Sequence, residues 1–327
     1  MIHDTVAANA QFMCTGAVTV TPAPQSYFWS PAQPYCQFWR SVLGFVLIHV
    51  VFFAATFGIF MGGGWLIGKH PADILDGGTA THAGIFFLTF LGYHLGLWLV
   101  VRFLHKRSYS TLFGAQRHVL WRQFRIGILI ALGVSLAASL LQMFEPLLVA
   151  PQDQTQLEQN LPTREWLLIL GPALILIFIQ IFAEELVFRG YMLQQLRARF
   201  QSIWIWAILP SVAFGLLHAD PATWGINAIF YVLHTSVVGI VLSFVTLRTG
   251  NIGAAAGLHF GNNMSMVLVG NAGSLDGFSL FVAEADLMGW TTTASMVLQT
   301  TLVLVAFVLW WNLTQRKPPI ANAAKAD

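Results

Sequence analysis

Eight apolar segments constrain this chain more than any other feature, because each is long enough or nearly long enough to cross a bilayer. A helix needs about 20 apolar residues to cross the hydrocarbon core. With 56% hydrophobic and 9% charged residues, the chain is too apolar for one water-soluble core. The sequence therefore predicts an all-α, polytopic membrane helical bundle with about eight transmembrane helices. We place them near residues 40–62, 82–103, 126–149, 166–190, 203–219, 224–247, 252–270 and 292–313.

The positions of the basic residues favour an even number of spans. Cytoplasmic loops collect Lys and Arg. If both termini are cytoplasmic, only Lys69 and Arg164 of the 16 basic residues lie outside the predicted cytoplasmic segments. We therefore expect an integral protein of the bacterial cytoplasmic (inner) membrane with both termini cytoplasmic. Because topology explains the basic residues, the net charge of +2 indicates no nucleic-acid partner. The lipid bilayer is the expected surrounding.

Two adjacent carboxylates and an arginine lie near the end of the fourth apolar segment. They belong to the run AEELVFR at residues 183–189, which follows an uncharged stretch over 166–182. Ionisable groups at membrane depth are costly and suggest a function. Glu185 and Arg189 are four residues apart on one helix face and can pair, whereas Glu184 points about 100° away from Glu185. We expect the pair to brace the site and Glu184 to be the reactive carboxylate.

Two later segments carry further polar residues at helical spacing. Phe214 and His218 share a face of the fifth segment, and His259 and Asn263 share a face of the seventh. Any one pair is explained equally well as a structural contact between helices. Three pairs in consecutive segments of so apolar a chain favour a shared polar cavity. A ridge of small residues on roughly the opposite side of the seventh segment should pack against a neighbouring helix; it consists of Gly253, Gly257 and Gly261.

In this order, the three pairs resemble the signature motifs of a known family. The motifs are Glu184-Glu185-x-x-x-Arg189, Phe214-x-x-x-His218 and His259-x-x-x-Asn263, with Thr249-Gly250-Asn251-Ile252 ahead of the third. They are similar to those of the CPBP family, the intramembrane proteases that include the type II CAAX prenyl endopeptidases and bacteriocin-immunity relatives. The resemblance covers about residues 165–270. It implies an intramembrane endopeptidase that cleaves a membrane-associated protein or peptide, which in the best-known cases is lipidated.

The resemblance also implies a role for each motif residue. The residues matching Glu184 and His218 would activate a water molecule, and those matching His259 and Asn263 would stabilise the oxyanion. Glu185, Arg189 and Phe214 would support the site. A carboxylate base, an imidazole and an amide donor are what peptide-bond hydrolysis requires.

Metal dependence is left open by the same residues. Glu184, His218 and His259 would supply the three protein ligands of a catalytic metal site, with zinc as the expected ion. No His-Glu-x-x-His helix is present in the sequence. A metal-free mechanism would use the same side chains.

The predicted spans and the resemblance together predict four parts of the chain. Residues 1–38 are a cytoplasmic lead-in, 39–164 carry three accessory helices, 165–270 form the catalytic core, and 271–327 hold the last helix and a cytoplasmic tail.

Two other functions stay open. A proton-coupled transporter would use Glu184, His218 and His259 as a relay, although no inverted repeat is evident. A non-catalytic membrane scaffold or immunity factor would need none of this chemistry.

The length of the fourth helix decides whether these residues can meet. If it ended at Arg189, Glu184 would lie only ~8 Å above the inner boundary and His218 ~24 Å above it. We therefore expect the helix to continue to about Arg197. Arg189 would then lie inside the bundle, paired with Glu185.

Overall fold

The chain folds into a helical bundle, described here for residues 27–151 and 154–314 of a computed structural model. Its α-helices are α2 (Phe38–Ile67), α3 (Ala80–Leu88), α4 (Leu91–Leu99), α5 (Trp121–Gln142), α6 (Glu145–Leu148), α7 (Thr163–Glu185), α8 (Gln194–Arg199), α9 (Leu209–Leu216), α10 (Pro221–Trp224), α11 (Asn227–Thr249), α12 (Gly253–Asn263) and α13 (Trp290–Leu313). The π-helical segments are η3 (Val100–Leu104), η6 (Leu186–Leu193) and η7 (Trp204–Ile208). The 3-10 segments are η1 (Ser30–Tyr35), η2 (Pro71–Ile74), η4 (Tyr109–Phe113), η8 (Met264–Val267) and η9 (Asp276–Phe278).

The predicted all-α membrane bundle is confirmed. In the described part of the chain, six helices are long and apolar enough to cross a membrane: Phe38–Ile67, Ala80–Leu104, Trp121–Gln142, Thr163–Arg199, Asn227–Thr249 and Trp290–Leu313. The other two predicted spans, 203–219 and 252–270, are helical but shorter. The apolar helix Trp204–Leu216 belongs to the shorter helices, those with a length of 10–17 residues, and α12 has 11 residues. At 1.5 Å per residue, α12 covers about half of the hydrocarbon core.

The first 26 residues and those after 314 lie outside the described residues. Most of the predicted lead-in and the predicted cytoplasmic tail belong to these parts. The predicted cytoplasmic position of both termini therefore stays a prediction.

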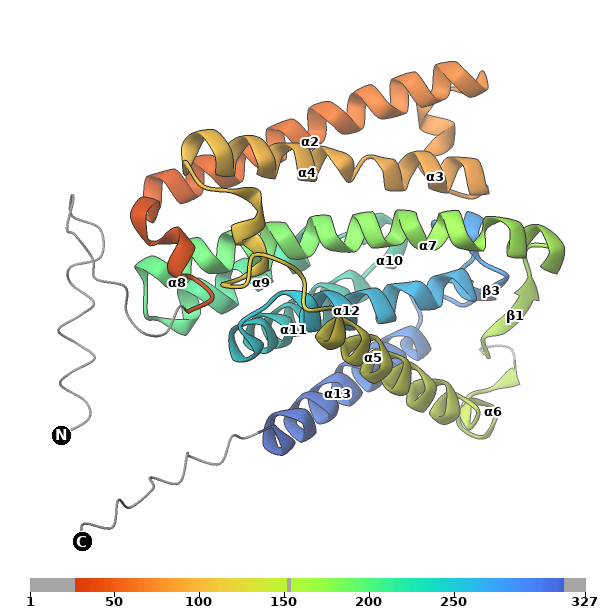
Figure 1. Ribbon diagram of the computed structural model, residues 1–327. Helices are drawn as coiled ribbons and strands as arrows, with labels where there is room; N and C mark the ends of the chain where they lie inside the picture. Colours follow the sequence, from red (N-terminus) through yellow and green to blue (C-terminus); the bar gives the residue numbers. More distant parts are fainter. Residues whose placement is uncertain (1–26, 152–153, 315–327) are drawn as a thin grey trace, which may run out of the picture.

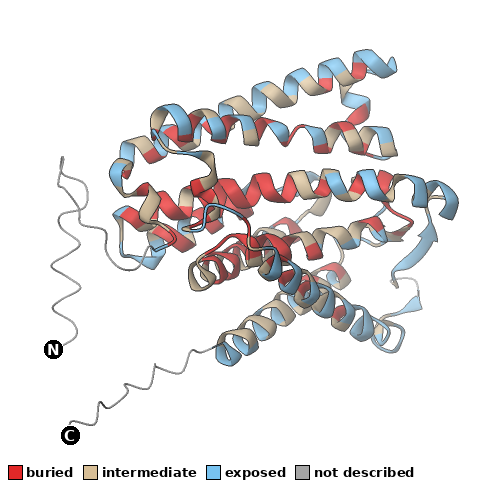
Figure 2. Ribbon diagram, viewed as in Figure 1, coloured by how far each residue is buried: buried red, intermediate tan, exposed pale blue. Residues whose placement is uncertain are grey.

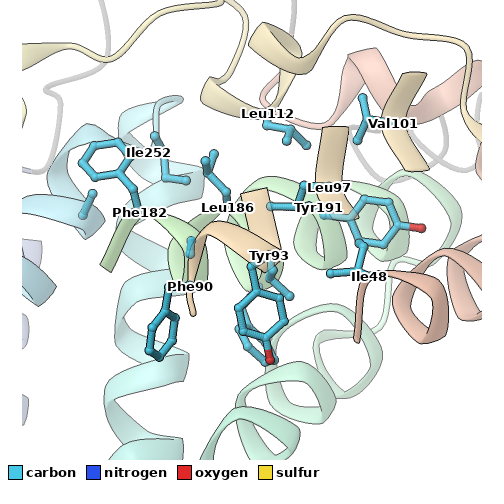
Figure 3. Packing of buried hydrophobic residues seen from close by; sticks show 14 of the residues in the cluster. Ile48, Phe90, Tyr93, Leu97, Val101, Leu112, Phe182, Leu186, Tyr191 and Ile252 are labelled. Atoms are coloured by element: carbon cyan, nitrogen blue, oxygen red, sulfur yellow. The ribbon is translucent and has the colours of Figure 1, made fainter. Parts of the chain in front are cut away.

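The helices pack in layers around the long helix that runs from α7 through η6 to α8. Figure 1 shows α2 and the pair α3 and α4 on one side of it, and α11 and α12 on the other. Helices α5 and α13 cross at the far side of α12. Burial is concentrated where α7 passes into η6 and along α12 (Figure 2). The largest apolar core gathers around this point and includes Ile48, Tyr93, Leu186, Tyr191 and Ile252 (Figure 3).

The predicted glycine ridge of α12 packs against α5. A Cβ atom at Gly257 would overlap the carbonyl oxygen of Phe124, and one at Gly261 would lie 2.8 Å from the Cβ of Ala131. Gly127 makes the matching approach from α5, because its Cβ would lie 2.5 Å from the carbonyl oxygen of Ala254. The predicted packing of this ridge against a neighbouring helix is therefore present, and His259, on another face of α12, contacts Glu185 of α7.

We expect Gly127→Ala to destabilise the protein, because the atoms that the new methyl group meets are backbone atoms of α12 and cannot rotate away. Overpacking of this kind costs about 1–3 kcal/mol. Gly133 is the matched control on α5, since nothing lies within 4 Å of a Cβ built there. Gly133→Ala should stabilise the helix by up to about 1 kcal/mol through helix propensity. Thermal unfolding in detergent measures both; equal shifts would contradict the close α5–α12 contact.

A small sheet at one end of the bundle joins three connecting segments. Strand β3 (Phe281–Glu284) lies between β1 (Gln156–Gln159) and β2 (Val269–Asn271). It pairs antiparallel with β1, with Gln156 opposite Glu284, and parallel with β2. The sheet ties the segment before α7 to the segments on either side of η9.

Candidate active site

The long fourth helix carries the two predicted carboxylates to the middle of the bundle. It continues without interruption from Thr163 to Arg199, so the expected extension beyond Arg189 is confirmed. Glu185 is fully buried, Arg189 is 1% exposed and Glu184 is 8% exposed. The π-helical segment η6 begins directly after Glu185, and π-helical turns occur frequently at functional sites.

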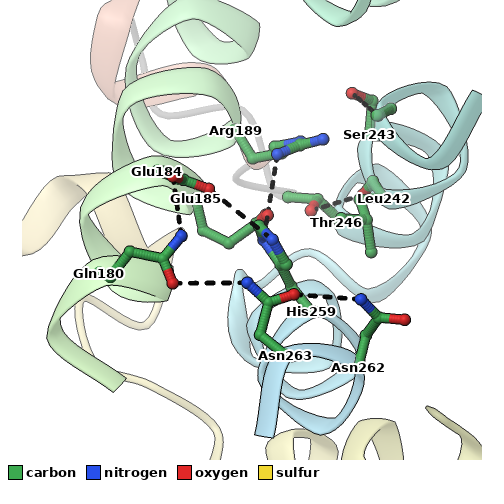
Figure 4. Close-up of polar contacts among 11 residues, drawn as sticks. Gln180, Glu184, Glu185, Arg189, Leu242, Ser243, Thr246, His259, Asn262 and Asn263 are labelled. Atoms are coloured by element: carbon green, nitrogen blue, oxygen red, sulfur yellow. Dashed lines mark hydrogen bonds and ion pairs between the residues drawn. The ribbon is translucent and has the colours of Figure 1, made fainter. Parts of the chain in front are cut away.

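Glu185 accepts two hydrogen bonds on the same oxygen. Arg189 Nη1 donates to its Oε1 at 2.8 Å, as predicted for the brace. His259 Nδ1, from α12, also lies 2.8 Å from this oxygen (Figure 4). Because an ionised carboxylate only accepts hydrogen bonds, His259 carries a proton on Nδ1. Glu185 therefore neutralises Arg189, as predicted. It also fixes the orientation of His259, and this second role was not predicted from the sequence.

Glu184 lies on the other side of the same imidazole. Its Oε2 is 3.7 Å from His259 Nε2, and its Oε1 accepts a hydrogen bond from Gln180 Nε2 at 2.8 Å. Oε2 is buried and makes no hydrogen bond to the described residues. One oxygen of Glu184 is thus held by an amide, whereas the other has its acceptor capacity left for a ligand.

Gln180 links Glu184 to the second residue of the α12 motif. Asn263 Nδ2 lies 3.4 Å from Gln180 Oε1, a long hydrogen bond, and Asn263 Oδ1 accepts from Asn262 Nδ2 at 3.1 Å. The sequence analysis missed Gln180. A signal was available, because Gln180 stands four residues before Glu184 in a stretch that is otherwise apolar.

Phe214 connects His218 to the polar cluster described above, which consists of Gln180, Glu184, Glu185, Arg189, His259 and Asn263. The Arg189 guanidinium lies 4.9 Å from the centre of the Phe214 ring, and the His259 ring lies edge-on to it at 6.0 Å. The His218 ring lies 4.8 Å from Phe214, and its Nδ1 donates to the Phe214 carbonyl oxygen at 2.8 Å. His218 therefore carries its proton on Nδ1 and keeps Nε2 as an acceptor. Within residues 27–151 and 154–314, no hydrogen bond joins His218 to Glu184.

The proposed metal ligands do not converge in this arrangement. In the described parts of the chain, no group of three His, Cys, Asp or Glu side chains is positioned to hold a metal ion. Zinc ligands lie about 2.0–2.2 Å from the ion in tetrahedral positions. The His218 ring packs against the rings of Phe214 and Tyr231, and Glu184 and His259 alone are too few ligands. Glu184, His218 and His259 therefore do not fit a catalytic zinc site as they stand here.

Comparison with known proteins agrees with the motifs. Residues 166–265 match the family described as Type II CAAX prenyl endopeptidase Rce1-like, which confirms the resemblance stated from the sequence. The matched segment includes every residue of the cluster. The uncharacterized protein YyaK of Bacillus subtilis (strain 168) is 28% identical over 220 residues, which cover 66% of this chain and 71% of that protein. With the six apolar helices, the match identifies an integral membrane protein and supports a CAAX-type intramembrane protease in general.

Proposed function

Because residues 166–265 of this chain match the type II CAAX prenyl endopeptidase Rce1-like family, we propose that the protein is an intramembrane endopeptidase with Glu184 as its general base. The substrate is a peptide bond of a membrane-associated protein or peptide, lipidated substrates included. One observation carries the proposal. A buried carboxylate oxygen that accepts no hydrogen bond from the described residues faces an imidazole at 3.7 Å, inside the matched segment.

In the proposed reaction, Glu184 Oε2 takes a proton from water while the water attacks the scissile carbonyl carbon. General bases act on groups within hydrogen-bond reach, and the second oxygen of Glu184 is already held by Gln180. His218, whose ring packs against Phe214 and keeps Nε2 as an acceptor, assists in orienting or deprotonating the water. The proton then passes to the leaving amine.

The oxyanion requires hydrogen-bond donors in the same cavity. Asn263 offers an amide NH₂ that is held only loosely, at 3.4 Å from Gln180. His259 donates from Nε2 once it is protonated, because Nδ1–H is already committed to Glu185. The carboxylates of Glu184 and Glu185 lie on either side of this ring, 3.7 Å from Nε2 and 2.8 Å from Nδ1. Glu185 and Arg189 act through His259 and are positioning residues. In this scheme the side chains serve as base and donors, not as metal ligands.

We also propose that the protein resides in a bacterial cytoplasmic membrane. The sorting of basic residues and the Bacillus subtilis relative support this location.

Substrate proteomics tests the proposed function. Cells that produce the wild type are compared with cells that produce equal amounts of Glu184→Gln, and new termini of membrane-anchored proteins are quantified. We expect one or a few termini that appear only with the wild type. Identical terminus profiles at equal protein levels would contradict the endopeptidase proposal. They would favour a scaffold or transport role.

A further inference from the structure

An apolar groove is lined by side chains of α5, α11, α12 and α13. Figure 1 shows where α5 and α13 cross. The volume of the groove is about 680 Å³, and α11 and α12 form its floor. Most of the lining side chains are aliphatic. Arg248 lies at one end, His234 lies further along α11, and His259 of the candidate active site also lines the groove. Arg248 and His234 are 14 residues apart on α11, which corresponds to about 21 Å along the helix.

A second cavity lies next to the groove at Arg248. Its volume is about 570 Å³, and it shares Arg248 and Thr249 with the groove. The remaining lining is mainly aromatic, and a second cation, Arg197, lies in the wall. The guanidinium of Arg197 is 4.5 Å from the Trp29 ring, and that of Arg248 is 4.0 Å from the Trp311 ring.

No carboxylate of the described residues neutralises the charge of Arg197 or Arg248. Among the described residues, neither forms an ion pair, and no Asp or Glu lines either cavity. Tryptophan and arginine at the end of an apolar span are typical of the membrane interface, where lipid head groups lie. The cavities therefore combine a cationic aromatic end with a hydrocarbon-lined groove about as long as one bilayer leaflet is thick.

From this geometry we propose that the two neighbouring cavities together bind one anionic phospholipid, with its phosphate between Arg197 and Arg248 and one acyl chain in the groove. The charges match a phosphate head group, and guanidinium groups bind phosphate well. The acyl chain would lie against His259, so the bound lipid and the substrate would share part of one wall. Lipid binding itself does not depend on the proposed catalytic function.

Native mass spectrometry of the full chain in neutral detergent tests the head group. The protein is titrated with palmitoyl-oleoyl-phosphatidylglycerol and, in parallel, with phosphatidylcholine of the same chains. We expect phosphatidylglycerol to bind saturably, one per protein, and more tightly. Arg248→Gln and Arg197→Gln should each weaken it roughly fivefold, the effect of losing about 1 kcal/mol per arginine. Arg199→Gln is the matched control, because Arg199 is exposed on the same helix as Arg197 and lines neither cavity.

A second variant tests the acyl chain. Ala306 lines the groove on α13, so Ala306→Trp should fill it and reduce phosphatidylglycerol binding while both arginines stay in place. Thermal unfolding of each variant shows whether it is folded; if this one is not, the arginine variants still decide the matter. Four results would overturn the proposal. These are equal affinity for phosphatidylcholine, equal losses in Arg199→Gln, full displacement of the lipid by millimolar inorganic phosphate, and binding of an apolar peptide acid in place of phosphatidylglycerol.

Discussion

Glu184→Gln should lower the rate of peptide cleavage by roughly 10²–10⁴-fold, the usual contribution of a positioned general base. Glutamine keeps the size of the side chain and can still contact Gln180 at the position of Oε1. It cannot accept a proton at the position of Oε2, which faces His259 at 3.7 Å. The fall should therefore appear in kcat, with KM little changed. Single-turnover cleavage of a peptide from the proteomic comparison, in proteoliposomes, measures it.

Glu165→Gln is the matched control for this substitution. Glu165 is exposed in the first turn of α7, one helix with Glu184 but far along it. The same chemical change there should leave the rate unchanged. His218→Ala should also reduce cleavage strongly, because it removes the Nε2 acceptor that His218 holds beside Phe214. If both Glu184→Gln and His218→Ala retained the wild-type rate while folded and inserted, this cluster would not be the active site.

The sequence predicted those features that depend on spacing within one helix. Apolar length gave the spans, and the interval of four residues placed Glu185 beside Arg189 and separated Glu184 from them. The glycine ridge of α12 was predicted for the same reason, because residues four apart repeat on one helix face. Glu184 and His218 can lie at a similar depth in the membrane only if the fourth helix continues past Arg189. The sequence therefore also predicted this extension. Each of these inferences needs only the geometry of a regular helix.

The features that the sequence did not predict depend on contacts between distant segments. Glu185 and His259 are 74 residues apart, and nothing in either motif indicates that His259 binds Glu185 and faces Glu184. The short length of α12 was also not predicted from the sequence. Its apolar run continues past Asn263, but the chain turns through η8 into β2, where backbone pairing with β3 replaces helical hydrogen bonds. Strands of three or four residues carry too little periodicity to be recognised.

Arg189→Met should be the most destabilising single substitution in the cluster. The Arg189 and Glu185 side chains are 1% and 0% exposed, and their charges meet at 2.8 Å. Removing one partner leaves the other charge buried and uncompensated, which costs about 3–5 kcal/mol. Glu185→Gln alone should have an effect of similar size, since Arg189 would then be the isolated charge. Thermal or denaturant unfolding in detergent measures the loss, with Arg199→Met as the control on an exposed arginine of the same helix.

The double variant Glu185→Gln/Arg189→Met separates stability from catalysis. Replacing a whole buried ion pair by neutral side chains is often neutral or stabilising, so most of the lost stability should return. Cleavage should not return. Glutamine can still accept the Nδ1–H of His259, but it no longer places a negative charge 2.8 Å from that ring. A double variant as unstable as the singles would contradict the pairing of charges. A stable and fully active one would show that Glu185 serves the fold alone and that His259 needs no carboxylate to position it.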